Sequence, residues 1–178
     1  MIDQILQRIT KQYCPLSVET LEGVKKYGTI RQIKKGELLV REGQFSDELY
    51  YVAEGGVRAY YLADGKTITD WFAFENDFIS SIVSFFLGVP SQHYIEMLED
   101  TTFMILQLKD IEALCDTYHD FEKLARMSTT KTMLQLQQRI VSLQFKSSKE
   151  RYDSLLERYP QIELRAPLGD IASYLGIT

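Results

Sequence analysis

Cysteine is scarce in this chain, and long apolar runs are missing. The two cysteines, Cys14 and Cys115, stand far apart and lack the spacing of metal ligands, which argues against a disulfide framework, a zinc site and an iron–sulfur cluster. A reducing cytoplasm is therefore the expected location. No apolar run approaches the roughly 20 residues that a membrane-spanning helix needs, so we expect no membrane among the partners.

Catalytic signatures are missing as well. The sequence has no glycine-rich phosphate loop, no zinc-ligand spacing and no recognisable order of serine, histidine and aspartate. The carboxylate pairs Asp47-Glu48 and Glu99-Asp100 fall in turn-like segments, where charged side chains are usually solvated. We therefore do not expect an enzyme, and no metal or cofactor is identified.

Charge is divided unevenly along the chain. The net charge of −5 argues at first against a nucleic-acid partner. From Phe121 to the end, however, nine Lys and Arg residues stand against six Asp and Glu residues, so this part carries +3 and the remainder −8. An acidic first part and a mildly basic second part fit a sensing domain joined to a DNA-facing one. Ordinary scatter of charge explains the division equally well.

The first part of the chain combines helices with many short β runs. Residues 2–14 have helical apolar spacing and end at Pro15, and Ser17 begins a second short helix. Asp64-Gly65 is typical of a hairpin turn, and residues 77–88 predict a strand end that passes into a short helix. Short strands at this spacing are typical of a barrel or jelly roll. The expected strands are 29–33, 38–40, 49–53, 57–62, 67–74 and 103–108.

The pattern becomes helical from Asp110 onward. Residues 120–145 contain neither Gly nor Pro and predict one long helix. Apolar residues in it follow a 3-4-3 spacing, which is the spacing of a seam shared by two helices. Ser147 and Glu150 form a capping box that opens the next helix, and Pro160 ends that helix. We therefore expect a homodimer whose interface contains Met133, Leu136, Ile140 and Leu143.

The last twelve residues, Pro167 to Thr178, have the pattern of an unfinished helix-turn-helix. Apolar residues stand at helical spacing, Gly176 ends the helix in a left-handed conformation, and Thr178 can cap a second helix. In this motif the second helix reads the major groove, and we expect that helix to be absent from the sequence. Arg165 and Lys149 are candidates for contacts with the DNA backbone. The expected DNA-binding element contains Ile171, Ala172, Tyr174, Leu175, Gly176 and Thr178.

Several short motifs occur in an order that is more specific than any of them alone. They are Lys35-Gly36-Glu37-Leu38-Leu39, Glu42-Gly43, Leu49-Tyr50-Tyr51-Val52, Gly55-Gly56-Val57-Arg58, Asp77-Phe78-Ile79, Arg151-Tyr152 with Leu155-Leu156, Pro160, and the terminal Ile171 to Thr178. In this order they resemble the cyclic-AMP receptor and fumarate-nitrate regulator (Crp/Fnr) family of bacterial transcription factors. The resemblance covers nearly the whole chain.

The resemblance implies an α+β fold in three parts. Residues 1–119 would form a cyclic-nucleotide-binding-like β-roll, or jelly roll, flanked by helices. Residues 120–146 would form a long dimerisation helix. Residues 147–178 would start a winged-helix-type helix-turn-helix domain that is incomplete in this chain.

The nucleotide-binding residues of the family are replaced in this sequence. The family has a Gly-Glu pair after Asp-Phe-Ile and an Arg-Ser or Arg-Thr pair before the following strand. This chain has Ser80-Ser81 and Ser91-Gln92-His93-Tyr94 at those places, so neither charged partner of the ligand is present. An unpaired buried phosphate costs on the order of several kcal/mol, and cyclic AMP is therefore not expected as a ligand.

Another small effector could still occupy the roll. Its contacts would come from Trp71, Phe72, Ser80, Ser81, Gln92, His93 and Tyr94, with apolar surface added by Phe85, Phe86 and Met97. Alternatively, the aromatic side chains simply fill the roll, and His93 is a surface residue; we favour both of these interpretations. Haem bound through His93 or His119 stays open, although nothing in the sequence supports it.

These observations predict a Crp/Fnr-like transcription regulator. It would be a cytoplasmic homodimer that binds DNA and senses an unknown small effector. The alternative is a ligand-binding or protein-interaction module with a degenerate cyclic-nucleotide-binding fold, which never contacts DNA. A native reading frame that continues past Thr178 with a polar and basic helix would favour the regulator.

Overall fold

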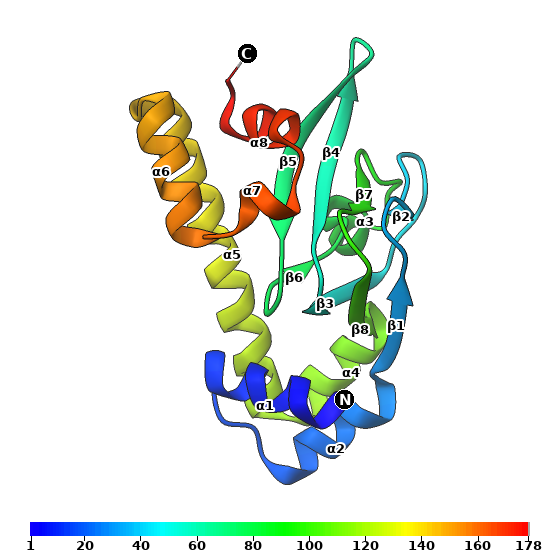
Figure 1. Ribbon diagram of the computed structural model, residues 1–178. Coiled ribbons are helices and arrows are strands. Elements are labelled where there is room, and N and C mark those ends of the chain that lie inside the picture. Colours follow the sequence, from blue (N-terminus) through cyan, green and yellow to red (C-terminus); the bar gives the residue numbers. More distant parts are fainter. Residues whose placement is uncertain (178) are drawn as a thin grey trace.

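Eight strands form two antiparallel four-stranded sheets in residues 1–177, which the computed structural model describes (Figure 1). One sheet has the order β1 (Thr29–Ile33), β8 (Thr101–Gln107), β3 (Glu48–Glu54) and β6 (Phe78–Ile79). The other has the order β2 (Leu38–Val40), β7 (Tyr94–Met97), β4 (Val57–Ala63) and β5 (Lys66–Ala73). The chain thus crosses repeatedly from one sheet to the other, as in a double-sheet roll.

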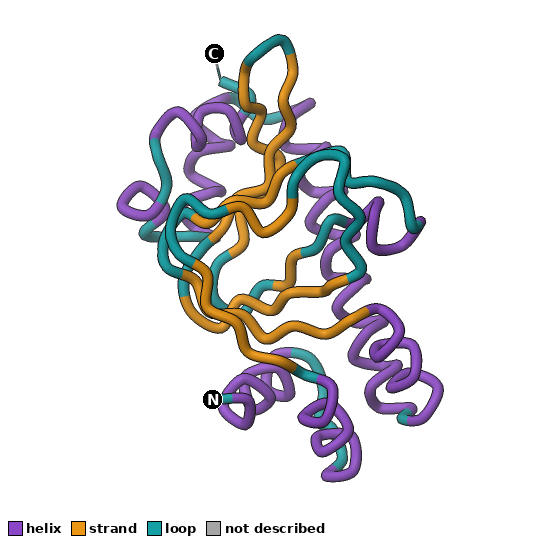
Figure 2. Tube along the Cα trace, turned by 90° about the vertical axis from the view of Figure 1, so that its right-hand side faces the viewer, coloured by secondary structure: helices purple, strands orange, loops and turns teal. Residues whose placement is uncertain are grey.

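The two sheets face one another and enclose an apolar core between them (Figure 2). Successive residues of a strand point to opposite faces, so alternate residues of each strand enter this core. Tyr50 and Val52 of β3 meet Phe103 and Ile105 of β8 in the core, and Ile95 of β7 enters it from the second sheet. All five side chains are fully or almost fully buried.

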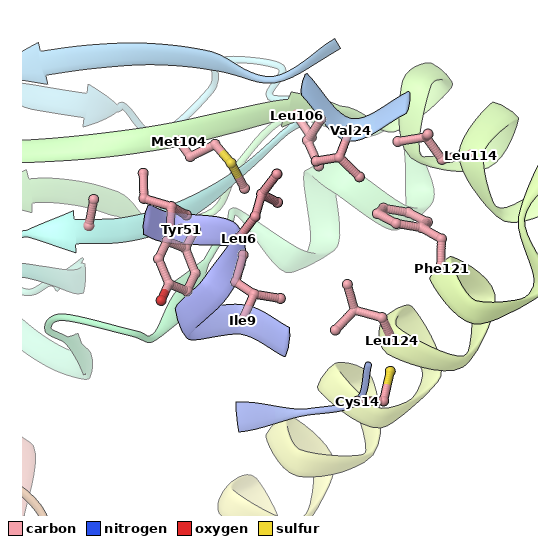
Figure 3. Packing of buried hydrophobic residues seen from close by; sticks show 12 residues of the cluster. Leu6, Ile9, Cys14, Val24, Tyr51, Met104, Leu106, Leu114, Phe121 and Leu124 are labelled. Atoms are coloured by element: carbon pink, nitrogen blue, oxygen red, sulfur yellow. The ribbon is translucent and has the colours of Figure 1, made fainter. Parts of the chain in front are cut away.

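Helices cover the outer face of the β1-β8-β3-β6 sheet. They are α1 (Ile2–Gln12), α2 (Val18–Tyr27), α4 (Leu108–Thr117) and the first turns of α5 (His119–Phe145). Figure 3 shows how Leu6 and Ile9 of α1 lie beside Tyr51 and Met104 of the strands, with Phe121 of α5 close by. This second apolar cluster attaches the start of the long helix to the roll.

The C-terminal helices lie against the outer face of the other sheet. After the short α3 (Ile82–Leu87) and the long α5 come α6 (Ser148–Arg158), α7 (Ile162–Arg165) and α8 (Leu168–Leu175). Figure 1 shows α8 beside β5, near the end of the hairpin that β4 and β5 form. A third apolar cluster joins Phe72 and Phe74 to Leu155, Ile171 and Leu175.

The expected α+β roll with its long helix is confirmed, and the differences lie at the level of single elements. The helix expected over 2–14 ends at Gln12, and the helix expected over 120–145 begins at His119. Strand β7 was not predicted, because Tyr94–Met97 has only four residues, too few to show a clear alternation. Among the described residues, no helix combines the length and apolar character needed to cross a membrane.

Candidate effector site and DNA-binding element

A group of buried serines lies at both ends of the segment that contains α3. Ser81 precedes α3 and is 0% exposed, and Ser91 precedes β7 and is 2% exposed. The Ser81 Oγ donates to the Ser91 Oγ over 2.8 Å, and the Ser91 Oγ in turn donates to the His93 carbonyl oxygen over 2.8 Å. The main chain reinforces this link, since Gly43 N–H donates to the Ser91 carbonyl oxygen over 2.8 Å. Hydroxyl groups therefore close the loop at the two positions where the resemblance would place charged ligand contacts.

His93 is buried, which corrects the interpretation of this residue as a surface side chain. Its side chain is 7% exposed and meets the Tyr61 ring edge-on, with ring centroids 5.4 Å apart. The Nε2 atom has no hydrogen-bond partner among the described residues. Burial lowers the pKa of His93, with Asp70 opposing the shift, so the imidazole is neutral at neutral pH. His93 stands immediately before β7 and alternates with Ile95 and Met97, which are also buried, but a strand of four residues is too short to show this period in the sequence.

The predicted pocket residues divide into two groups in the structure. Ser80, Ser81 and His93 are all buried in the roll, whereas Gln92 is exposed. Tyr94 points away from His93 and stacks on Tyr60, with centroids 5.1 Å apart.

The aromatic residues do not form one ligand lining, and they do not all fill the roll as the favoured interpretation held. Phe72 belongs to the cluster under the C-terminal helices, while Trp71 packs against the core between the sheets. Phe85 is buried but Phe86 is 60% exposed, and Met97 lies in the core. The physical reason is the strand period, since adjacent residues such as 71 and 72 face opposite sides of one sheet.

The interior of the roll contains no fixed positive charge. In the part of the chain that the structure describes, no lysine or arginine is fully buried. The arginine of β4, Arg58, points to the outer face, where it pairs with Glu96 over 2.7 Å and with Asp170. Neutral His93 and the serine hydroxyls are thus the polar groups that a ligand in the roll would meet.

The predicted seam of the long helix is exposed in the single chain. Met133, Leu136, Ile140 and Leu143 are 59%, 37%, 56% and 44% exposed. Leu134, Val141 and Phe145 extend the exposed apolar surface along the second half of α5. A helix so apolar on its outer side is typical of a helix that packs against a partner.

The predicted helix before the turn is present as α8. Ile171 and Leu175 are buried, while Ala172 and Tyr174 are half-buried. Gly176 ends the helix with φ of 64°, in the left-handed region that favours glycine. The Ile177 N–H then donates to the Ala172 carbonyl oxygen over 2.9 Å. Thr178, the expected cap of a following helix, lies outside the described residues.

Ion pairs and hydrogen bonds hold the C-terminal helices on the roll. Arg165 of α7 pairs with Glu75 over 2.8 Å and with Glu99. Its guanidinium is therefore engaged within the protein, which corrects the expectation that it contacts a DNA phosphate. Asp170 of α8 pairs with Arg58; burial raises the pKa of this carboxyl, and Arg58 opposes the shift. The Ser173 Oγ accepts from the Thr69 N–H over 2.9 Å.

Comparison with known proteins identifies the family. Residues 30–118 match the family described as "Cyclic nucleotide-binding domain". Because this match covers half of the chain, the chain belongs to the cyclic nucleotide-binding domain family. No curated protein matches the chain in sequence.

Solved structures of Crp/Fnr family regulators share its fold. FixK2 from Bradyrhizobium japonicum is 22% identical with a TM-score of 0.72, over 85% of this chain and 78% of that one. CooA from Carboxydothermus hydrogenoformans, a mutant form, is 21% identical with a TM-score of 0.66, over 90% and 78%. The catabolite activator protein of Thermus thermophilus is 18% identical with a TM-score of 0.62, over 96% and 81%. At these identities the likeness establishes the fold, and the resemblance expected from the sequence is confirmed.

Proposed function

We propose that this protein is a Crp/Fnr-like transcription regulator that acts in the cytoplasm as a DNA-binding homodimer. Residues 1–119 are its effector domain, 120–146 its dimerisation helix, and 147–178 the start of its DNA-binding domain. The observation that carries the proposal is the exposed apolar seam of α5, which connects the roll to the C-terminal helices. A helix in this position, shared by two subunits, couples events in the roll to the spacing of two DNA-binding elements.

The C-terminal helices support the DNA-binding part of the proposal. The capped α6, the short α7 and the glycine-terminated α8 have the order of the elements that precede a recognition helix. Residues 147–178 themselves carry four Lys and Arg against five Asp and Glu, so the order of the elements, and not their net charge, supports this part of the proposal.

Selection of duplex DNA from a random pool tests the DNA-binding part directly. With the protein at its native length, we expect a two-fold symmetric sequence to be enriched, because each subunit of a dimer reads one half-site. Recovery of no sequence above background would favour the alternative of an interaction module without DNA binding.

The effector that we propose for the roll is a small molecule without a phosphate charge. Among the described residues, the buried polar groups at this place include the Ser81 and Ser91 hydroxyls and the neutral His93 imidazole, whose Nε2 has no hydrogen-bond partner. Such groups bind an uncharged donor or acceptor, whereas a buried phosphodiester requires a cation. Cyclic AMP is thus not the proposed ligand.

A thermal-shift measurement with cyclic AMP tests this statement about the effector. We expect no change in Tm, because a ligand stabilises the folded state only if it binds there. A clear rise in Tm at micromolar cyclic AMP, abolished in Ser81→Val and kept in the exposed-site control Thr129→Val, would overturn it.

A further inference from the structure

A groove lined by positive charge lies between the long helix and the C-terminal helices. It has a volume of about 500 Å³ and is bounded by α5, α6 and α8. Four of the residues that line it are cations, namely Arg139, Lys146, Arg151 and Arg158, and none is Asp or Glu. The chain as a whole carries a net charge of −5, so this gathering of cations is local.

The four cations have no carboxylate partner within residues 1–177. None of them takes part in an ion pair there. Arg151 donates to the carbonyl oxygens of Leu175 and Lys146, each over 2.7 Å, and the Lys146 Nζ donates to the Ser154 Oγ over 2.8 Å. Their hydrogen bonds therefore go to neutral acceptors and leave the positive charge uncompensated.

Aromatic rings position the two remaining guanidinium groups. Arg139 lies over the Tyr174 ring at 3.8 Å from its centroid, and Arg158 lies over the Trp71 ring at 5.1 Å. The Nη2 atom of Arg158 is buried and has no hydrogen-bond partner among the described residues. A buried guanidinium N–H without an acceptor is unfavourable, and like charges in one groove repel each other. An anion in the groove would relieve the repulsion between the cations.

The rest of the lining indicates the size and character of that anion. Ser142 and Gln138 add neutral hydrogen-bonding groups, while Val141, Leu155 and Leu175 add apolar surface. We propose that this groove binds a small organic phosphate with two or more negative charges and an apolar or aromatic body. Guanidinium groups suit phosphate oxygens because they form paired, charge-assisted hydrogen bonds.

The groove fits a small molecule better than the DNA backbone. Three of its four cations are half-buried between helices, and only Lys146 is exposed. A duplex contacts exposed cations on a convex surface, whereas a concave site of this volume encloses a compact ligand. Anion binding in the groove requires neither DNA binding nor a ligand in the roll, and only its effect on a DNA-facing part rests on the proposed function.

Because of its position between helices, a ligand bound in the groove can affect the arrangement of the C-terminal helices. Arg139 belongs to α5, Arg158 to α6, and Tyr174 to α8. A ligand that contacts all three helices stabilises one arrangement of the C-terminal helices relative to the long helix. It would therefore act on the DNA-facing part of the protein separately from the effector in the roll.

Calorimetric titration of the full chain tests the proposal, with pyrophosphate, ADP and adenosine as probes. We expect ADP and pyrophosphate to bind in low salt, and adenosine, which lacks the charge, to bind at least about tenfold more weakly. In the double variant Arg139→Gln/Arg158→Gln the affinity for ADP should fall about tenfold or more. Lys146→Gln, at an exposed position, should weaken ADP binding without affecting the fold.

Lys123→Gln and Lys149→Gln are matched controls, because both cations are exposed and lie outside the groove. Both should bind ADP like the wild type. The proposal is overturned if the wild type binds none of the three probes, or if the groove variants bind ADP as tightly as the wild type. It is equally overturned if these variants lose affinity for duplex DNA and none for ADP, since the groove would then be a DNA contact.

Discussion

At the scale of single residues, the proposal for the roll depends most on His93. A neutral imidazole with a free Nε2 can exchange a hydrogen bond with a ligand but supplies no charge. The serines beside it are satisfied by one another and by the main chain. The polar part of the candidate site is therefore small, fixed in position and uncharged.

The burial of His93 makes protein stability depend on pH. Because burial lowers its pKa below the ordinary 6.5, the unfolded chain binds the proton more readily than the folded protein. Its contribution to stability is complete above pH 6.5 and is lost as the pH falls through the lower, folded-state pKa. We expect the free energy of unfolding, measured with urea, to fall between about pH 7 and pH 5.5.

The variant His93→Gln should lose less stability than the wild type over the same pH range. His119→Gln is the matched control, because this second histidine is exposed at the start of α5, and it should keep the wild-type pH dependence. Equal pH dependence in His93→Gln and the wild type would contradict the assignment of a buried neutral imidazole.

At the scale of elements, α6 begins with a capping box that the sequence predicts and the structure contains. The Ser147 Oγ accepts from the Glu150 N–H over 3.3 Å, and the Glu150 carboxylate accepts from the Ser147 N–H over 2.8 Å. Ser147→Ala should lower the free energy of unfolding by about 1 kcal/mol, because a helix N–H loses its acceptor. Urea denaturation measures this effect.

Thr129→Ala on the exposed face of α5 is the control for Ser147→Ala. It removes a hydroxyl that bonds only to the Ala125 carbonyl oxygen one turn earlier, and alanine is the better helix former. We expect it to leave stability unchanged or slightly higher. A loss in Thr129→Ala as large as that in Ser147→Ala would mean that the cap is not the cause.

Elements with a local signal were predictable, whereas packing between distant segments was not. The strands around Asp64-Gly65, the long helix and the Ser147 cap follow from turn residues and periodicity close in sequence. The inward face of His93 depended on β7, which is too short to give a clear period. The position of Phe72 under α8 depends on contacts across some hundred residues, about which a local pattern carries no information.

At the scale of the whole molecule, the C-terminal helices rest on the roll through a mixed apolar and ionic contact. Arg165 is central to it, since it pairs with Glu75 and Glu99 and lies over the Phe74 ring at 4.4 Å from the centroid. Arg165→Gln leaves the two carboxylates without their cation. We expect a loss of about 1–2 kcal/mol in the free energy of unfolding, because these pairs are only partly buried.

Urea denaturation also checks the Arg165 variant against Lys149→Gln. Lys149 is an exposed cation of α6 that forms no ion pair among the described residues, and its replacement should change stability by less than about 0.5 kcal/mol. Equal effects of the two substitutions would mean that the contact between α7 and the roll contributes little.

The exposed seam of α5 is the feature on which the account of a dimeric regulator depends. Ile140 lies in the middle of that seam and is 56% exposed in the single chain. In a dimer this side chain becomes buried between two helices, where a charge is costly. A charged residue at this position should therefore act on association and leave the fold of each subunit intact.

Sedimentation velocity of the wild type and of Ile140→Glu is the most direct test. The account predicts a wild-type dimer and a folded Ile140→Glu monomer, with Gln138→Glu, at an exposed position on the opposite side of α5, still dimeric as the matched control. A monomeric wild type, or an Ile140→Glu protein that sediments as the same dimer, would contradict it.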